Sequence, residues 1–197
     1  MPDDPEASQP EPVAALSHLA LSVGSLTRSE SFYREVFGFA VSPAPPYRGT
    51  GRRLARLMEV PGCEIWGLFL RKGDFFLELL EYQPAGRTRD RAYRDDEIGF
   101  AHLSFIVEDL DSVAHAVDSH GGEMHGDTQV DLSFGEGEPV TIAFCLDPDG
   151  NRIELVEHRD EVGRTKHADF LGAGALGWPA PFQQLPRRAN VADPEWS

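Results

Sequence analysis

The chain has 197 residues, of which 41% are hydrophobic, and its formal net charge is −15. That length predicts one domain or two small halves that share a core, and the hydrophobic fraction is large enough to fill one. A charge of this sign repels nucleic acids and anionic membrane surfaces, so we expect neither as a partner. Taken alone, the charge indicates solubility and nothing more specific.

The cysteines and the N-terminus bear on the compartment. Two cysteines, Cys63 and Cys145, are too few for a disulfide framework or a thiolate metal site, and Cys145 lies in the apolar run VTIAFCL, which predicts a buried thiol. No apolar run approaches the ~18 residues of a membrane-spanning helix, and the acidic, proline-rich start PDDPEASQPEP is not typical of a signal peptide. We therefore expect a cytoplasmic protein.

An internal repeat organises the chain. LSHLALSVGSLTRSESFYREVFGF opens the first copy and FAHLSFIVEDLDSVAHAVDSHGGE opens the second, and His18 then aligns with His102. The polar, proline-rich ends lack this periodicity. The predicted organisation is a disordered N-terminal segment at 1–14, a first module at 15–82, a linker at 83–99, a second module at 100–158 and a C-terminal tail at 159–197.

Each copy predicts a strand, a helix and two or three further strands. The first strands, 18–23 and 102–107, alternate in hydrophobicity, and the helices that follow carry apolar stripes at helical spacing. Apolar strands come next: EIWGLFL and DFFLELLEY in copy one, PVTIAFCL and NRIELVEH in copy two. DPDGN before the last strand is a strong turn signal. The pattern predicts an α+β fold made of two βαβββ modules.

The repeat places four ionisable side chains at equivalent positions. His18 and Glu78 belong to the first and last strands of copy one, and His102 and Glu154 to those of copy two. The two His are 84 residues apart and the two Glu 76, and we assign the eight-residue difference to the proline-rich segment 43–53. Strand alternation turns all four to the face opposite the buried leucines and isoleucine.

Imidazole and carboxylate ligands suit Zn²⁺, Fe²⁺, Mn²⁺, Co²⁺ or Ni²⁺. A single strand histidine is more commonly a hydrogen-bonded core residue, and a single glutamate a surface residue. Two of each at repeat-equivalent positions favour a metal site instead, because four such groups would be costly to bury without an ion. We predict one divalent metal ion per chain, bound by His18, Glu78, His102 and Glu154.

Several of these motifs resemble a known superfamily. HLALSV, HLSFIV, FLELLEY and DPDGNRIELVEH are similar to segments of the vicinal oxygen chelate (glyoxalase, bleomycin-resistance and dioxygenase) superfamily, and the resemblance covers residues 15–158. It implies two βαβββ modules that form a cupped mixed or antiparallel sheet around a divalent metal, which substrates chelate through adjacent oxygens. The superfamily's ligand positions correspond to His18, Glu78, His102 and Glu154.

The four ligand positions narrow the choice within the superfamily. Its antibiotic-binding members usually lack the ligands, and its ring-cleaving dioxygenases use two His and one carboxylate, which leaves isomerases and glyoxalase I-like lyases. The segment LMEVPGCEIWGLFLRKGDFFLELLEYQPAGR resembles the valiolone epimerases. We therefore expect an epimerase that moves a proton next to a metal-chelated ketone of a cyclitol such as 2-epi-5-epi-valiolone, with Glu154 and Glu78 as the catalytic carboxylates.

Three alternatives stay open. A glyoxalase I-like lyase needs a basic site for the carboxylates of glutathione, and no distinctive basic pair is visible. A methylmalonyl-CoA epimerase-like enzyme carries a further acid where this sequence has Gly62. A small-molecule-binding protein without turnover is the third. Candidate helper residues, each more commonly an ordinary loop residue, are Tyr47, Tyr93, Arg94 and His125.

Beyond a small-molecule substrate, we expect a second copy of the chain as a partner in a homodimer. The C-terminal tail carries Trp178 and Phe182 among glycines and prolines. Large aromatic side chains usually bury area in a soluble acidic protein, so we predict that the tail is ordered around these two residues.

Overall fold

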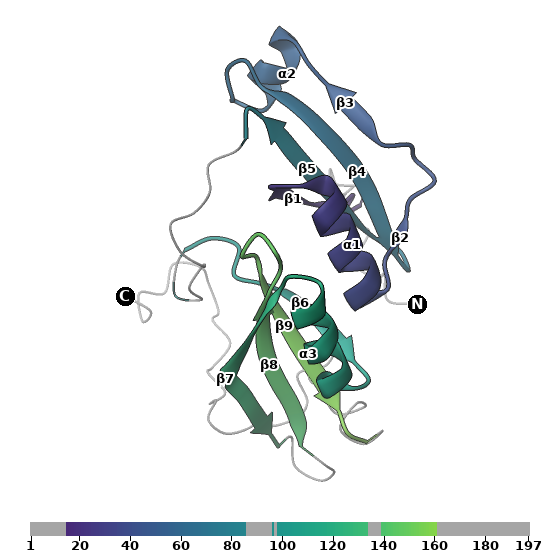
Figure 1. Ribbon diagram of the computed structural model, residues 1–197, viewed down its shortest axis with the longest axis vertical. Helices are drawn as coiled ribbons and strands as arrows, with labels where there is room; N and C mark the ends of the chain where they lie inside the picture. The colour runs from purple at the N-terminus through teal and green to yellow at the C-terminus, as the bar shows by residue number, and fades with distance from the viewer. Residues whose placement is uncertain (1–14, 86–95, 97, 134–138, 161–197) are drawn as a thin grey trace, which may run out of the picture. The chain divides into compact units, whose positions relative to one another are not determined.

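The computed structural model describes residues 15–85, 96, 98–133 and 139–160, in which the chain divides into two units (Figure 1). Among the described residues, the first unit holds 15–34 and 38–85, and the second holds 35–37, 96, 98–133 and 139–160. The N-terminal segment, most of the linker and the tail lie outside the described residues, and so do Tyr93, Arg94, Trp178 and Phe182. None of the described helices is long and apolar enough to span a bilayer.

The first unit is a five-stranded mixed sheet with one long helix. Its strand order is β1-β5-β4-β2, with β3 also paired to β4; β1 and β5 are parallel and the other pairs antiparallel. In chain order the elements are β1 (Leu19–Val23), α1 (Leu26–Phe37), β2 (Ala40–Val41), β3 (Tyr47–Gly49), α2 (Arg52–Leu57), β4 (Glu64–Lys72) and β5 (Phe75–Gln83).

The second unit repeats this topology with four strands. Its order is β6-β9-β8-β7, with β6 parallel to β9 and the other pairs antiparallel. The elements are β6 (Leu103–Val107), α3 (Leu110–Ser119), β7 (Glu123–Leu132), β8 (Val140–Leu146) and β9 (Arg152–His158). Two βαβββ modules with mixed sheets are therefore confirmed, and in the first module the second strand is split into β2 and β3.

The eight extra residues of the first module lie after β3. Twenty residues separate Tyr47 from its cross-strand partner Gly67, whereas twelve separate the equivalent residues Val130 and Ile142. An eight-residue difference therefore falls in the connection between β3 and β4, residues 50–63, which holds α2 and overlaps the predicted segment 43–53 only at 50–53. A short helix is an economical way to fold such an insertion, because it pairs the inserted backbone groups internally.

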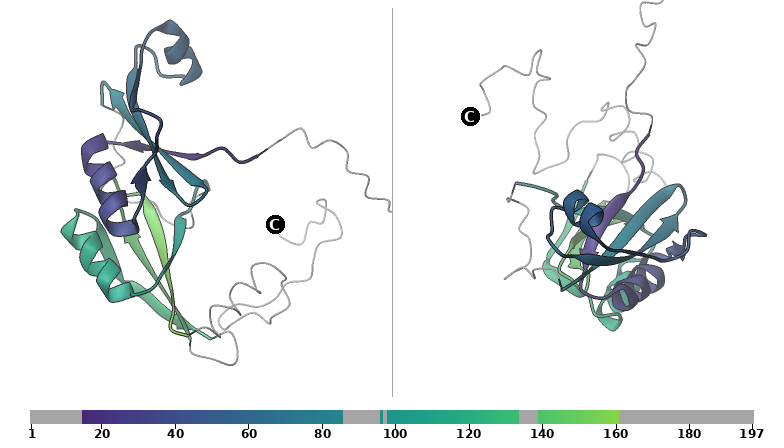
Figure 2. Two further views of the ribbon diagram at one scale, coloured as in Figure 1. Left: turned by 90° about the vertical axis from the view of Figure 1, so that its right-hand side faces the viewer. Right: turned by 90° about the horizontal axis from the view of Figure 1, so that it is seen from above.

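Side-chain alternation separates a helix side from an open side in both sheets. Leu77, Leu79, Ile153 and Leu155 are fully buried and alternate with partly exposed residues along β5 and β9. Figure 2 shows α3 lying along one face of the β6–β9 sheet. Covering one face leaves the other available for polar side chains, which is where a site can form.

A second glutamate on the last strand of each module anchors the helix. Glu81 accepts a hydrogen bond from the backbone N–H of Leu26 at 2.9 Å, and Glu157 accepts one from Leu110 at 2.9 Å. Leu26 and Leu110 are the first residues of α1 and α3, whose N-terminal N–H groups have no partner within the helix. Each carboxylate therefore satisfies one orphan donor and sits at the positive end of the helix dipole.

The DPDGN turn fixes the register of the last hairpin. Asp147 is 3% exposed, and its Oδ1 accepts hydrogen bonds from the backbone N–H groups of Asp149 and Asn151 at 2.9 and 2.8 Å. Gly150 has a φ of 82°, a left-handed conformation that favours glycine. The turn signal is confirmed, and the register that it sets places Phe144 opposite Glu154.

We expect Glu157→Ala to lower the free energy of unfolding by about 1.5 kcal/mol, because α3 loses a charge-assisted hydrogen bond at its first residue. Urea unfolding followed by circular dichroism measures the change. Glu123→Ala, at an exposed position of the same sheet, is the control and should shift stability by less than ~0.5 kcal/mol. Equal losses in the two variants would show that Glu157 does not anchor the helix.

Burial raises the pKa of the Cys145 thiol to about 12, with smaller contributions from the charges of Asp147 and Asp118. The raised pKa favours the neutral thiol of the folded state, so this contribution to stability is complete below the unfolded pKa of about 8.5 and declines as pH rises above it. At pH 8 we expect a thiol reagent to modify Cys145 only after unfolding in guanidinium chloride. Mass spectrometry of the labelled peptides checks this, and fast modification of native protein would contradict it.

Candidate functional site

The first module brings His18 and Glu78 together. Ala20 of β1 lies opposite Glu78 of β5, and His18, two residues earlier, projects from the same side of the sheet. The His18 Nε2 and Glu78 Oε2 atoms are 3.2 Å apart, and the side chains are 35% and 13% exposed. An imidazole nitrogen and a carboxylate oxygen thus face each other at the surface of the open face.

Two neighbours, Ser17 and Phe69, orient the imidazole of His18. The Ser17 hydroxyl lies 2.9 Å from Nδ1 of His18, which leaves Nε2 directed at Glu78. The ring of Phe69 meets the imidazole edge to face, with centroids 5.4 Å apart, from the position directly opposite Glu78 on β4. A hydrogen bond at the far ring nitrogen is the usual support of a metal-binding histidine.

Tyr47 of β3 donates a hydrogen bond from its hydroxyl to Oε1 of Glu78. Partial burial, followed by the hydrogen bond and the negative charge of Glu78, raises the pKa of this phenol well above its usual value near 10. The phenol is therefore a neutral donor to the carboxylate at neutral pH. Tyr47 was expected only as a candidate helper residue, more commonly an ordinary loop residue, and the structure places it in direct contact with a predicted ligand.

The second module brings His102 and Glu154 together in the same way. Ser104 of β6 lies opposite Glu154 of β9, and His102 is again two residues before that position. The His102 Nε2 and Glu154 Oε2 atoms are 3.8 Å apart, and the Ser104 hydroxyl donates to the same Oε2 at 2.6 Å. Phe144 meets the imidazole at 5.3 Å between centroids.

The two half-sites, His18 with Glu78 and His102 with Glu154, share one frame. In each, histidine precedes by two residues the strand partner of the glutamate, and a phenylalanine lies opposite that glutamate on the neighbouring antiparallel strand. The pairs of equivalent residues are His18 and His102, Ala20 and Ser104, Phe69 and Phe144, and Glu78 and Glu154. Phe69 and Phe144 were not anticipated from the sequence, although each is the third residue of the equivalent apolar stretches GLFL (67–70) and IAFC (142–145).

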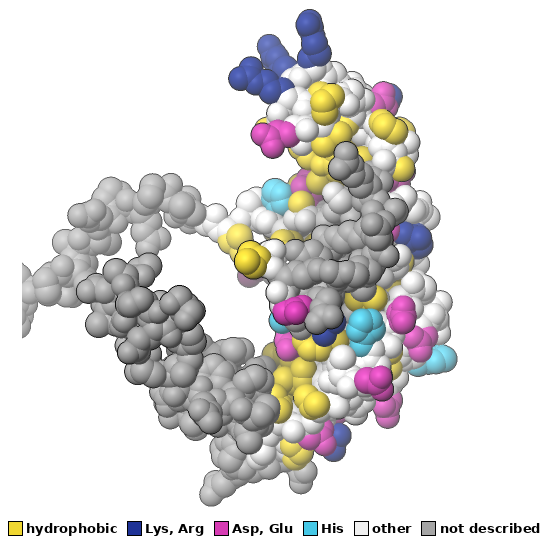
Figure 3. Space-filling model, turned by 90° about the vertical axis from the view of Figure 1, so that its left-hand side faces the viewer, with side chains coloured by type: hydrophobic (Ala, Val, Ile, Leu, Met, Phe, Trp, Pro, Cys, Tyr) yellow, Lys and Arg dark blue, Asp and Glu magenta, His cyan; other side chains and the backbone are white. Residues whose placement is uncertain are grey.

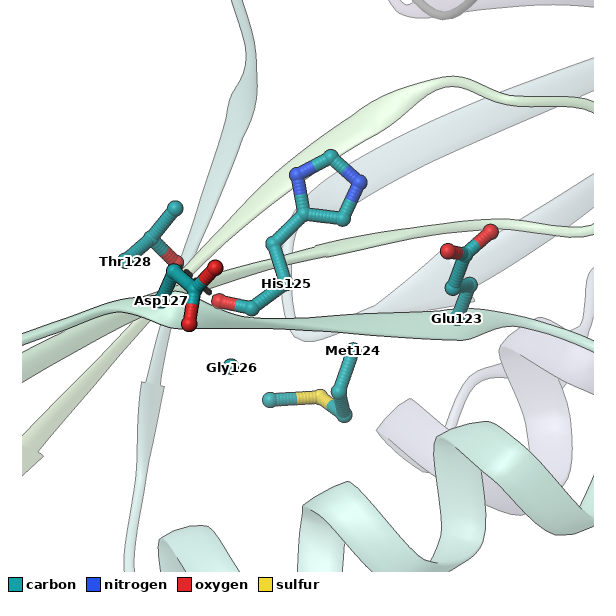
Figure 4. A pocket seen from close by; sticks show the side chains of 6 residues that line it. All are labelled: Glu123, Met124, His125, Gly126, Asp127 and Thr128. Carbon is teal, nitrogen blue, oxygen red and sulfur yellow. Dashed lines mark hydrogen bonds between the residues drawn. The ribbon is translucent and has the colours of Figure 1, made fainter.

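His125 lies on the open face of the second sheet. It is opposite Phe144, which is in turn opposite Glu154, so the three share one side of the sheet. Figure 4 shows His125 and Met124 projecting from opposite sides of β7, at a pocket of about 340 Å³. His125, a candidate helper residue, therefore belongs to the same face as Glu154, with one strand between them.

The predicted ligands of each module are one imidazole and one carboxylate, the kinds of donor that a divalent ion takes. Among the described residues, no group of three or more His, Cys, Asp and Glu side chains gathers closely enough to hold a metal ion. The structure instead brings the predicted ligands together as two pairs, each an imidazole nitrogen that faces a carboxylate oxygen. This nitrogen and oxygen chemistry suits the ions named from the sequence.

The inserted helix α2 carries three exposed arginines. Arg52, Arg53 and Arg56 are exposed on α2, and Figure 3 shows Lys and Arg side chains gathered at the end of the molecule where Figure 1 places that helix. Leu54 of α2 lies beside Gly49, at the end of the sheet beyond Tyr47. No distinctive basic pair was predicted from the sequence. The run RRLAR at 52–56 is the sequence signal that could have revealed this group of arginines.

Comparison with known proteins agrees with this architecture. The profile of the Glyoxalase/Bleomycin resistance protein/Dioxygenase superfamily matches residues 15–155. A glyoxalase family protein from Bacillus cereus has a similar solved structure, with a TM-score of 0.62 and 19% identity over 77% of this chain and 98% of that one. The structural likeness at this identity supports the fold.

Two relatives of known name are similar in sequence. A lactoylglutathione lyase of Schizosaccharomyces pombe is 26% identical over 160 residues, which cover 79% of this chain and 51% of that protein. A lactoylglutathione lyase of Haemophilus influenzae is 28% identical over 145 residues, covering 72% and 91%. The chain thus spans about half the length of the fission yeast protein and most of the bacterial one.

Proposed function

Because the chain belongs to the glyoxalase/bleomycin resistance protein/dioxygenase superfamily, we propose that it is a metal-dependent epimerase. The reaction is proton transfer at a carbon next to a ketone, on a cyclitol with an adjacent hydroxyl such as 2-epi-5-epi-valiolone. One divalent ion per chain is held by His18, Glu78, His102 and Glu154. The observation that carries the proposal is the duplicated His–Glu pair on equivalent strands.

When bound, the metal supplies Lewis acidity that lowers the pKa of the carbon acid in the substrate. The chain's own residues do the rest. His18 and His102 each present Nε2 toward a carboxylate, while the phenyl rings of Phe69 and Phe144 pack against the imidazoles and restrict their rotation. We assign removal of the proton to Glu154 and delivery of a proton on the opposite face of the substrate carbon to Glu78, because epimerisation takes a proton from one face and returns one on the other.

The choice of a cyclitol rests on sequence resemblance. Residues 57–87, which include β4 and β5, are similar to the valiolone epimerases. Neutral polyols offer vicinal oxygens and no charge, so the open face needs hydroxyl-binding groups more than ionic ones. Ser104 and His125 lie on the Glu154 side of the second sheet and are suited to that task.

A glyoxalase I-like lyase is the second candidate. Two named relatives are lactoylglutathione lyases. The arginines of α2 also provide a basic group on the first module, which the carboxylates of a glutathione adduct would require. Glutathione-dependent loss of methylglyoxal would support the lyase, and deuterium uptake by a cyclitol in D₂O would support the epimerase. Tight ligand binding without either reaction would indicate a binding protein.

We expect the purified protein to contain about one divalent metal ion per chain, measured by elemental analysis. His102→Ala should lose that metal, because one of the four ligands is removed and metal binding depends on the complete set. His115→Ala, on the exposed side of α3, is the matched histidine control and should keep it. Retention of metal by His102→Ala would show that the ion is held elsewhere.

We expect Glu154→Gln to lose proton transfer while it keeps much of its metal. Glutamine preserves an oxygen ligand and removes the basic carboxylate, and a lost general base costs ~10²–10⁴-fold in rate. Deuterium exchange into the substrate, followed by NMR in D₂O, measures the loss, and elemental analysis gives the metal content of the same sample. If the fully metallated variant exchanged at near the wild-type rate, His125 would become the first candidate for the base.

A further inference from the structure

We propose that Tyr47 is a positioning residue that holds one oxygen of Glu78 and so fixes the direction in which this carboxylate presents the other, a support that Glu154 lacks. This inference rests on the proposed function, since it concerns the support of one of the proposed metal ligands. It concerns residues of the first module that the second module does not reproduce.

Both oxygens of Glu78 are engaged. Oε1 accepts the hydrogen bond of the Tyr47 hydroxyl, and Oε2 faces Nε2 of His18 at 3.2 Å. Glu78 is also the less exposed glutamate of the two, with 13% of its side chain accessible against 21% for Glu154. A carboxylate held at one oxygen by a phenol presents the other in a set direction, in the way that hydrogen-bond partners orient metal-binding side chains.

Gly67 makes room for this contact. Tyr47 of β3 pairs with Gly67 of β4, and the phenol ring lies over that glycine on its way to Glu78 of β5. A Cβ built on Gly67 would stand 2.3 Å from both Cζ and the hydroxyl oxygen of Tyr47, far inside the 3.0 Å that real Cβ atoms keep. The glycine and the tyrosine therefore act as one device, in which the missing side chain provides the path of the phenol.

The second module has neither part of the device. Its residues at the positions of Tyr47 and Gly67 are Val130 and Ile142, which pair across β7 and β8. Valine carries no hydroxyl and isoleucine leaves no gap, so Glu154 has no equivalent of the phenol. The difference lies in two residues of an otherwise repeated frame.

Glu154 is held at one oxygen atom. Its Oε2 accepts the hydrogen bond of Ser104 and is also the atom nearest to His102. Among the described residues, no hydrogen bond reaches Oε1. A carboxylate with an uncommitted oxygen can rotate about its terminal bond, whereas Glu78 would first have to break its hydrogen bond with Tyr47.

The experiment measures binding of Mn²⁺ alone to the metal-free full chain by isothermal titration calorimetry. Tyr47→Phe removes only the hydroxyl. We expect it to weaken Mn²⁺ binding ~10–100-fold, the usual effect of removing a hydrogen bond to a metal-binding side chain. Gly67→Ala should weaken binding to a similar extent because it displaces the ring. Tyr82→Phe, a second tyrosine of β5, is the matched control and should bind Mn²⁺ as the wild type does.

A double-substitution cycle separates positioning from general damage to the sheet. In Tyr47→Ala the ring is absent, so adding Gly67→Ala should weaken Mn²⁺ binding no further, although Gly67→Ala alone does. A further loss of affinity in the double variant would show that Gly67 does not act through Tyr47 and would overturn that part of the proposal. Circular dichroism of each variant confirms folding, and Tyr47→Phe carries the test by itself if the Gly67 variant does not fold.

A last variant distinguishes failure of this inference from failure of the proposed function. Glu78→Ala should abolish Mn²⁺ binding if Glu78 is a ligand. If it does so while Tyr47→Phe binds Mn²⁺ like the wild type, the positioning role of Tyr47 is overturned and the metal site stands. If Glu78→Ala keeps wild-type affinity, both the metal site and the role of Tyr47 are overturned.

Discussion

The parallel pairing of the first and last strands is the constraint on which both half-sites depend. A helix connects the first strand to the rest of the module, so β1 can lie parallel to β5, and β6 to β9. The register then puts Ala20 opposite Glu78 and Ser104 opposite Glu154, with each histidine two residues earlier. A slip of one residue would turn each glutamate to the helix side, and the burial of Leu77, Leu79, Ile153 and Leu155 opposes such a slip.

The last strand of each module links the site to the helix that covers the sheet. Glu78 and Glu81 are three residues apart on β5, and an odd spacing on a strand directs two side chains to opposite faces. One glutamate therefore joins the half-site while the other accepts the N–H of the first residue of α1. Glu154 and Glu157 divide the two tasks in the same way on β9. In each module the carboxylate of the His–Glu pair and the carboxylate that anchors the helix are thus held by the same strand.

Strand alternation and the internal repeat were sufficient to predict the two modules. They also predicted that the histidine and the glutamate of each module lie on the same face of its sheet. Both signals are local or depend only on aligning one copy with the other. Contacts that cross strands with independent registers were harder to anticipate, such as Tyr47 with Glu78. The position of β3 on β4 depends on how the chain folds between them. Sequence spacing alone therefore did not show that the eight extra residues of the first module lie after β3. The repeat did not single out Ser104, because the equivalent residue of the first module is Ala20, which has no hydroxyl.

A repeated frame with unequal neighbours offers a chemical advantage that a strictly symmetric one lacks. Two identical carboxylates on a metal ion would compete for the same role, since each would be equally able to bind the ion and to take a proton. In this chain the frame supplies the same imidazole and carboxylate twice, and the neighbours differ: a phenol over a glycine beside Glu78, and a serine beside Glu154. These neighbours leave the fold unchanged, because they occupy the open face and take no part in the core beneath the helices. The fold therefore fixes where the carboxylates stand, and the side chains around them determine what each can do.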